Sequence, residues 1–277
     1  MSATFTPNFN RIAAPYRWLE YLTFGPALAR CRSHFLGALA DRRRALILGD
    51  GDGRFTARLL ATNPHLQADA VDLSPAMLAL LTHRAAAAHP TALQRLHTHV
   101  ADARAFTPTG IYDLVVTHFF LDCLTQAELD ALATRLRPHL APTAIWVVSD
   151  FRIPTGPLRP AARALVSSLY LGFRVLTKLR TTRLPDHAAA LGAAELTRTA
   201  QHLSLGGILT TELWSPAAAY TFTAEPAYIP SMQLPPQKPR TAHPPDPVPD
   251  PEPASPSLPE PDPAVFHPAT PTDTRKP

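Results

Sequence analysis

The residues best placed to do chemistry are the glycines and carboxylates of the run Gly49-Asp-Gly-Asp-Gly53, together with Asp72 some twenty residues downstream. The apolar run 45–48 precedes the glycines, and Asp72 ends a second apolar run. In doubly wound α/β domains, a glycine turn after one strand lets the backbone approach a nucleoside cofactor, and an acid after the next strand binds the ribose hydroxyls. The pattern therefore indicates a nucleoside cofactor, and the glycine spacing bears on which one.

The spacing of this turn argues against two other ligands. A calcium loop that begins at Asp50 needs a glutamate at its twelfth position, where the chain has Ala61. A dinucleotide turn needs G-x-G-x-x-G, and its third glycine position is Arg54. Asp50 and Asp52 would repel a pyrophosphate, whereas they suit a cofactor that carries an ammonium and a sulfonium. A nicotinamide-dependent oxidoreductase stays open only if both carboxylates point away from the ligand, and helix capping is their structural alternative.

The remaining pattern, G-x-G-x-G after a strand, resembles the cofactor turn of class I S-adenosylmethionine-dependent methyltransferases, and the resemblance covers residues 40–224. The segments Val71-Asp-Leu-Ser-Pro-Ala-Met77, Val100-Ala-Asp-Ala103 and Tyr112–Asp122 follow in the family's order. The N-terminal segment Phe9–Glu20 is similar to ubiquinone/menaquinone-type methyltransferases.

This resemblance implies S-adenosyl-L-methionine as the cofactor. It implies that Asp72 binds the ribose hydroxyls and that Asp102 lies near the adenine amino group. The residues that it assigns to the cofactor are Gly49, Asp50, Gly51, Gly53, Asp72, Leu73, Asp102, Ala103 and His118. The chain departs from the family at Ile47, where an acid usually binds the cofactor's amino group, and we expect Asp50 to take over that contact.

The end of the fourth predicted strand supplies the candidate catalytic residues, His118 and Asp122. Methyl transfer requires alignment of the reactants and sometimes a base, and an imidazole has a suitable pKa near 6.5. Packing of His118 beside the cofactor and helix capping by Asp122 are the structural alternatives. Thr117, Asp150 and Arg152 also border the expected site.

A parallel sheet is needed to bring these residues together. Strands are predicted at 45–48, 69–73, 97–101, 113–121 and 144–149, with helices at 54–62, 75–88 and 126–137. Further helices are expected at 160–179 and 185–203, followed by an antiparallel edge hairpin of strands 207–214 and 218–223. This alternation predicts an α/β fold, Rossmann-like and doubly wound, with a mostly parallel seven-stranded sheet and helices on both faces.

Composition divides the chain into a globular body and a tail. Eighteen of the 32 prolines follow Glu225, so residues 225–277 are expected to form a proline-rich, disordered tail. Residues 1–40 are predicted to form an N-terminal helical cap and residues 41–224 the methyltransferase domain. Within that domain, residues 152–184 are expected to form a helical lid.

The distribution of charged residues indicates which classes of partner the chain suits. The net charge is +4, and the segment Arg152–Arg183 holds seven Lys/Arg and no acid. A basic amphipathic helix here suits a lid over an apolar substrate or a peripheral contact with an anionic membrane through 160–180, and a packed helix with a solvated basic face is the alternative. Nucleic acid is disfavoured because the charge is moderate and no aromatic residues interleave with the basic ones.

Two cysteines, Cys31 and Cys123, are too few for a disulfide framework or a zinc site, and no metal is expected. The N-terminus lacks the pattern of a signal peptide and no apolar run reaches membrane-spanning length, so we expect a cytoplasmic protein. The function expected is methylation of a small, lipophilic molecule. A non-catalytic binding or scaffold protein of the same fold is the alternative, and the sequence leaves the oligomeric state open.

Overall fold

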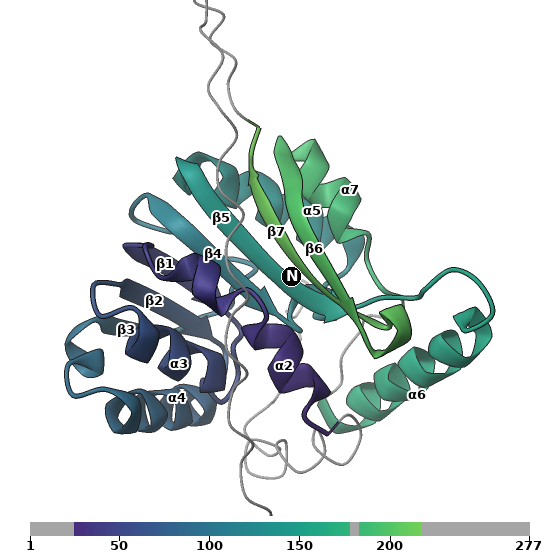
Figure 1. Ribbon diagram of the computed structural model, residues 1–277, viewed down its shortest axis with the longest axis horizontal. Helices are drawn as coiled ribbons and strands as arrows, with labels where there is room; N and C mark the ends of the chain where they lie inside the picture. Colours follow the sequence, from purple (N-terminus) through teal and green to yellow (C-terminus); the bar gives the residue numbers. More distant parts are fainter. Residues whose placement is uncertain (1–24, 178–182, 218–277) are drawn as a thin grey trace, which may run out of the picture. The chain divides into compact units, whose positions relative to one another are not determined.

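The computed structural model describes residues 25–177 and 183–217, with side chains described outside 170–177. At its centre lies a seven-stranded sheet in the order β3-β2-β1-β4-β5-β7-β6 (Figure 1). The strands are β1 (Arg44–Leu48), β2 (Gln67–Asp72), β3 (Leu96–Val100), β4 (Tyr112–His118), β5 (Leu140–Phe151), β6 (Leu196–Ser204) and β7 (Leu209–Pro216). Strands β1 to β5 pair in parallel, and β7 is antiparallel to both β5 and β6. The chain runs outward from β1 to β3 and returns to the other side of β1 with β4, which creates a topological switch point where such folds bind ligands.

Helices cover both faces of the sheet, with α3 and α4 on one face and α5 and α7 on the other (Figure 1). The helices are α2 (Ala27–Ser33), α3 (Arg54–Thr62), α4 (Pro75–Ala88), α5 (Gln126–Leu136), α6 (Arg159–Thr177) and α7 (His187–Ala193). Short 3-10 turns lie at Leu36–Leu39, Ala92–Gln94, Leu121–Cys123, Arg137–His139 and Leu205–Gly207. Alternate residues of β1 enter the two cores: Ala45 and Ile47 pack with the α3 and α4 side, and Leu46 and Leu48 with the α5 side. The predicted fold class is confirmed.

Local sequence signals start the helices directly after the strands. Ser74 follows β2 and caps α4 by accepting a hydrogen bond from the Met77 amide, and Pro75 occupies the first turn. Thr125 and Glu128 form a reciprocal capping box at the start of α5. These starts hold the strand-to-helix loops at the carboxyl edge of the sheet.

One predicted helix is wrong in its second half. The helix expected at 185–203 ends at Ala193, and its second half is β6, which pairs with β7 in the register Leu196↔Pro216. The β-branched Thr197 and Thr199 fit a half-exposed edge strand, and pairing with β7 decides against the helix that the apolar spacing suggested. The edge hairpin is therefore β6–β7, whereas the strand expected at 218–223 lies outside the described residues.

The fourth strand is shorter than predicted. It ends at His118 rather than at residue 121, because Phe119 adopts a left-handed conformation with φ of 52° that turns the chain out of the sheet. The other predicted strands and helices up to residue 179 overlap the observed elements. Most of the predicted N-terminal cap and the whole proline-rich tail lie outside the described residues, and no helix in the described part is long and apolar enough to cross a membrane.

Candidate functional site

The glycine turn follows β1 at the switch point. The Gly49 amide donates to the Val71 carbonyl of β2, and Gly49, Gly51 and Gly53 all have positive φ. A Cβ on Gly49 would collide with Phe120, which follows β4, whereas a Cβ on Gly51 would meet nothing within 4 Å. The turn is therefore packed against β4 at its start and open at its centre, as a backbone that receives a ligand requires.

Asp50 has one oxygen engaged by the protein and one that is not. Its Oδ2 accepts hydrogen bonds from the Thr56 amide (3.0 Å) and the Thr56 hydroxyl (2.7 Å), so it caps α3. Its Oδ1 is buried and has no hydrogen-bond partner among the described residues. Burial raises the pKa of Asp50, although the Thr56 hydrogen bonds and the charge of Arg32 oppose this. An unpaired buried acceptor costs about 1–3 kcal/mol, a cost that a donor on a ligand removes.

Asp52 does not share this role. Its carboxylate forms ion pairs with Arg54 (3.0 Å) and Arg84 (2.6 Å), and the Arg84 guanidinium also donates to the Asp52 carbonyl. Two arginines therefore balance its charge. Of the two carboxylates that the sequence suggested for a cationic ligand, only Asp50 retains an unpaired oxygen.

Asp72 ends β2 beside the turn. Its Oδ1 accepts the Ser74 amide at 2.8 Å. Burial raises the pKa of Asp72 to about 6, and the charge of Asp50 adds to the rise, while the backbone amides of Ser74 and Gly51 oppose it. The two carboxylates thus lie close enough to interact, as the expected site requires, and Leu73 beside them is half-buried.

Asp102 is bound by a neighbouring arginine. Arg104 donates to both carboxylate oxygens, at 2.9 Å from Nε to Oδ1 and 2.7 Å from Nη2 to Oδ2, and reaches Glu128 with Nη1. Partial burial acts to raise the pKa of Asp102, but the Arg104 hydrogen bonds outweigh it and hold that pKa below its ordinary value. Ala103 is buried, and its carbonyl accepts from Arg135. Asp102 therefore lies after β3 as expected, with its side chain already paired.

His118 lies at the end of β4, between the sheet and α3. It is buried, its ring packs edge-on against Phe55 at 4.3 Å between centroids, and neither ring nitrogen has a hydrogen-bond partner among the described residues. Burial, followed by the charge of Arg32, lowers its pKa well below the usual value. The imidazole is therefore neutral at pH 7. The strained backbone of Phe119 directly after it is the kind of outlier that clusters at functional sites.

Arg32 is a site residue that the sequence did not single out. It comes from α2, is buried, and places its guanidinium carbon 4.9 Å from the centre of the Phe119 ring. Its charge acts on both Asp50 and His118. No motif marks this position in the sequence, because α2 precedes the sheet and only the fold brings it to the carboxyl edge.

Asp122 and Asp150 form a buried carboxylate pair next to these residues. The Asp122 amide donates to Oδ2 of Asp150 at 3.1 Å, and the Cys123 thiol donates to Oδ1 of Asp122 at 3.5 Å. Burial raises the pKa of Asp122 to about 6, and burial together with the charge of Asp122 raises that of Asp150 well above its ordinary value. Thr117 instead accepts the Trp146 indole N–H in the core, 3.0 Å away, so it serves packing.

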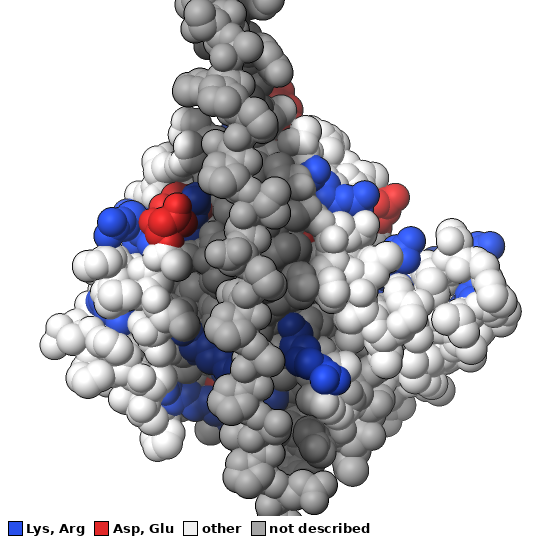
Figure 2. All heavy atoms as spheres, in the orientation of Figure 1, with Lys and Arg blue, Asp and Glu red and all other residues white. Residues whose placement is uncertain are grey.

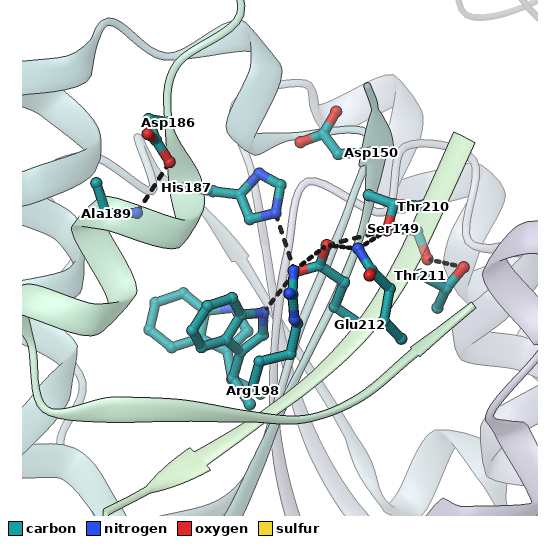
Figure 3. A network of polar contacts seen from close by, with 12 residues as sticks. Ser149, Asp150, Asp186, His187, Ala189, Arg198, Thr210, Thr211 and Glu212 are labelled. Atoms are coloured by element: carbon teal, nitrogen blue, oxygen red, sulfur yellow. Dashed lines mark hydrogen bonds and ion pairs between the residues drawn. The ribbon is translucent and has the colours of Figure 1, made fainter. Parts of the chain in front are cut away.

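A second polar cluster, on β7, has a structural role (Figure 3). Glu212 accepts from His187, Arg198 and the indole of Trp214. Burial opposes ionisation, but the His187 hydrogen bond and charge prevail and lower the pKa of Glu212 to about 2. The cluster ties α7 to the β6–β7 hairpin. In the part of the chain that is described, no group of three or more His, Cys, Asp or Glu could hold a metal ion.

Comparison with known proteins adds a domain assignment. A family model described as a methyltransferase domain matches residues 46–145. A curated relative, polyamine aminopropyltransferase 2 of Bacillus anthracis, is 31% identical over 139 residues, which are 42% of this chain and 39% of that protein. The matched part thus spans less than half the length of this curated relative.

Solved structures share the fold at low sequence identity. Mitomycin 7-O-methyltransferase has a TM-score of 0.56 and 15% identity, with 76% of this chain and 61% of that chain covered. The methyltransferase of calicheamicin biosynthesis, in its SAH-bound form, has a TM-score of 0.53 and 19% identity, with 73% of this chain and 56% of that chain covered. At these identities the likeness shows the fold, which is that of class I methyltransferases.

Proposed function

Because the chain carries a methyltransferase domain of the class I, S-adenosylmethionine-dependent superfamily, we propose that it transfers a methyl group from S-adenosylmethionine to a small, lipophilic acceptor. The observation that carries the proposal is the buried, unpaired Oδ1 of Asp50 beside Asp72 and Arg32. A ligand that offers an ammonium, ribose hydroxyls and a carboxylate matches these three side chains. S-adenosylmethionine has all three groups and, when bound, supplies an electrophilic methyl group on its sulfonium.

Each side chain then has one role. Asp50 accepts a hydrogen bond from the ammonium, the open backbone of Gly51 lets the cofactor approach, and Asp72 accepts from the ribose hydroxyls. Arg32 pairs with the carboxylate. Ile47, which replaces the family's usual acid, is fully buried in the core beneath the turn and contributes packing only.

Arg32 also discriminates methyl transfer from aminopropyl transfer, the reaction named for the curated relative. A donated aminopropyl group carries no carboxylate, so such a donor offers no anionic group to the Arg32 guanidinium. A cation beside Asp50 is therefore expected in a protein that binds the intact amino acid portion.

We expect Arg32→Met to weaken binding of S-adenosylhomocysteine about tenfold, because one charge-assisted hydrogen bond contributes about 1.5–3 kcal/mol. Binding of 5′-methylthioadenosine, which lacks the amino acid portion, should change less than twofold. Calorimetry with both ligands measures the difference. Arg30→Met, on the exposed side of the same helix, is the matched control. Equal losses for the two ligands would assign Arg32 a structural role only.

The acceptor is expected to be lipophilic because apolar side chains lie between α2, α6 and the carboxyl ends of β4 and β5. The partly buried members of this cluster include Phe119, Cys123, Leu169 and Leu184, packed on Phe151 and Leu28. Asp122 borders this lining, because its carboxylate accepts from the thiol of Cys123, a member of the cluster. Within this proposal, α6 is the helical lid over the acceptor.

We propose Asp122 as the base that takes the acceptor's proton and His118 as a neutral imidazole that contacts the cofactor. A carboxylate with a pKa of about 6 is ionised at neutral pH and still accepts a proton well, whereas the pKa of His118 lies too low for that task. The non-catalytic alternative requires that no acceptor be methylated at all.

Transfer of a labelled methyl group from S-adenosylmethionine to a panel of apolar phenols, acids and amines tests the activity. We expect Asp122→Asn to lower kcat at least about a hundredfold, with binding of S-adenosylhomocysteine unchanged. The exposed Asp130, on α5, gives the control variant Asp130→Asn, which should keep full activity. If wild-type protein binds the cofactor but methylates none of the panel, the result supports the non-catalytic scaffold alternative. If Asp122→Asn stays active, Asp122 is not the base.

A further inference from the structure

We propose that the protein docks on anionic bilayers through three exposed leucines, Leu158, Leu203 and Leu205, and two flanking arginines, Arg159 and Arg163. We call this surface the leucine edge. It comprises the residue before α6, the first turns of α6, the end of β6 and the turn between β6 and β7, and it is distinct from the cofactor site.

The leucine edge is formed by two segments that meet. A Cβ placed on Gly206 would lie 3.1 Å from Cδ1 of Leu158, so Leu158 rests against the β6–β7 turn directly beside Leu205. Leu158 is 51% exposed, Leu203 43% and Leu205 45%, whereas most leucines of the described residues are buried. A cluster of exposed apolar side chains at a turn commonly marks an interaction site.

The backbone holds Leu205 in place under strain. Leu205 has a φ of 50° and is followed by Gly206 and Gly207, whose φ values are 63° and 84°. Leucine rarely adopts this left-handed conformation, which Asn and Gly adopt readily. A strained conformation that presents an apolar side chain to water points to a use for that side chain.

The charge around the leucine edge favours an anionic partner. Residues 151–185 and 196–211, which supply both segments, contain no Asp or Glu. Arg159 and Arg163 are exposed on the first turns of α6, and the part of the face in Figure 2 that belongs to α6 carries blue and no red. Arginines near leucines that insert shallowly are the arrangement that recognises anionic headgroups.

The described half of α6 turns its apolar face to the protein and not to a bilayer. In its described half, Ala162 and Val166 of α6 are buried, and Val166 packs with Leu28 and Phe151. The membrane contact expected through 160–180 therefore moves to the leucine edge, with α6 contributing its charges. Since β5 and β7 pair Phe151 with Leu209, this edge adjoins the apolar cluster of the site. An acceptor could then enter from the bilayer, a consequence that rests on the proposed function, whereas docking itself does not.

Co-sedimentation of the full chain with vesicles tests the proposal. We expect wild-type protein to bind vesicles of phosphatidylglycerol and phosphatidylcholine at least tenfold more tightly than phosphatidylcholine alone. The double variant Leu158→Asn/Leu205→Asn should lose at least tenfold, and it keeps the fold because Asn tolerates the φ of residue 205. The variant Arg159→Gln/Arg163→Gln should lose the preference for anionic vesicles. Leu93→Asn, at a leucine that is 47% exposed after α4, is the matched control and should bind as wild type does.

Three results would overturn the proposal. These are equal binding to neutral and anionic vesicles, unchanged binding of the leucine variant, and an equal loss in Leu93→Asn. A change of oligomeric state in the leucine variant, without vesicle binding by wild type, would instead assign the edge to contact between copies of the chain. Binding of S-adenosylhomocysteine in solution should be unaffected in all these variants, so a failure of docking and a failure of the proposed function are separable.

Discussion

Replacing Asp72 by alanine is expected to weaken binding of S-adenosylmethionine at least tenfold. Asp72 ends β2 beside the glycine turn, with a carboxylate that the protein satisfies only in part through backbone amides. Hydrogen bonds from two ribose hydroxyls to this charge would each contribute about 1.5–3 kcal/mol, and tenfold in affinity corresponds to about 1.4 kcal/mol. Calorimetric titration with S-adenosylhomocysteine measures the change, and unchanged binding would reject Asp72 as a cofactor ligand.

The ionised Asp72 carboxylate is expected to favour cofactor binding but to lower the stability of the cofactor-free protein. The folded-state pKa of Asp72 is about 6, above the ordinary value of 3.8, so the folded protein holds this proton more tightly than the unfolded chain does. Its contribution to stability is therefore present at low pH and is lost as the pH rises from about 4 to about 6. We expect Asp72→Asn to raise the Tm of the cofactor-free protein at pH 7.5 while it weakens cofactor binding. A lower Tm would show that the ionised carboxylate stabilises the fold.

Replacing Gly53 by alanine is expected to destabilise the protein by about 2–5 kcal/mol. A Cβ at this position would lie 2.5 Å from the backbone Cα of Leu81 on α4, and the residue has a φ of 75°. Overpacking typically costs about 1–3 kcal/mol and a left-handed conformation about 1–2 kcal/mol more. Urea unfolding followed by circular dichroism measures the loss.

Gly51→Ala separates these two costs. Its φ of 60° imposes a similar backbone strain, but its Cβ would meet nothing within 4 Å. We expect a stability loss of only about 1–2 kcal/mol, with weaker cofactor binding because the new methyl group enters the open side of the turn. Equal destabilisation by the two variants would contradict the close approach of α3 to α4 as the reason for Gly53.

The alternation of apolar runs and turns predicted the parallel core because β1 and β4, at its centre, are almost fully buried, and because α4 and α5 begin at local caps. The edge strand β6 was not predicted. About half of its side chains are exposed, and its threonines and leucines fit a helical spacing as well as an alternating one. Pairing with β7, a tertiary interaction, decides between the two.

The sequence could place site residues together only where they lie close to one another along the chain. The glycine turn and Asp72 depend on residues near each other in sequence, and the structure brings them together. The pairing of Asp52 with Arg84 and the approach of Arg32 to Asp50 depend on contacts of the glycine turn with α4 and α2, which spacing alone does not reveal. The cytoplasmic location and the boundaries of the cap, lid and tail remain predictions.

Calorimetric titration of the wild-type chain with S-adenosylhomocysteine and with NAD, side by side, tests the central claim most directly. The unpaired Asp50 oxygen, the open Gly51 backbone and Asp72 predict binding of S-adenosylhomocysteine at one site per chain and no binding of NAD, whose pyrophosphate the Asp50 carboxylate repels. Binding of NAD, or no binding of S-adenosylhomocysteine, would contradict it.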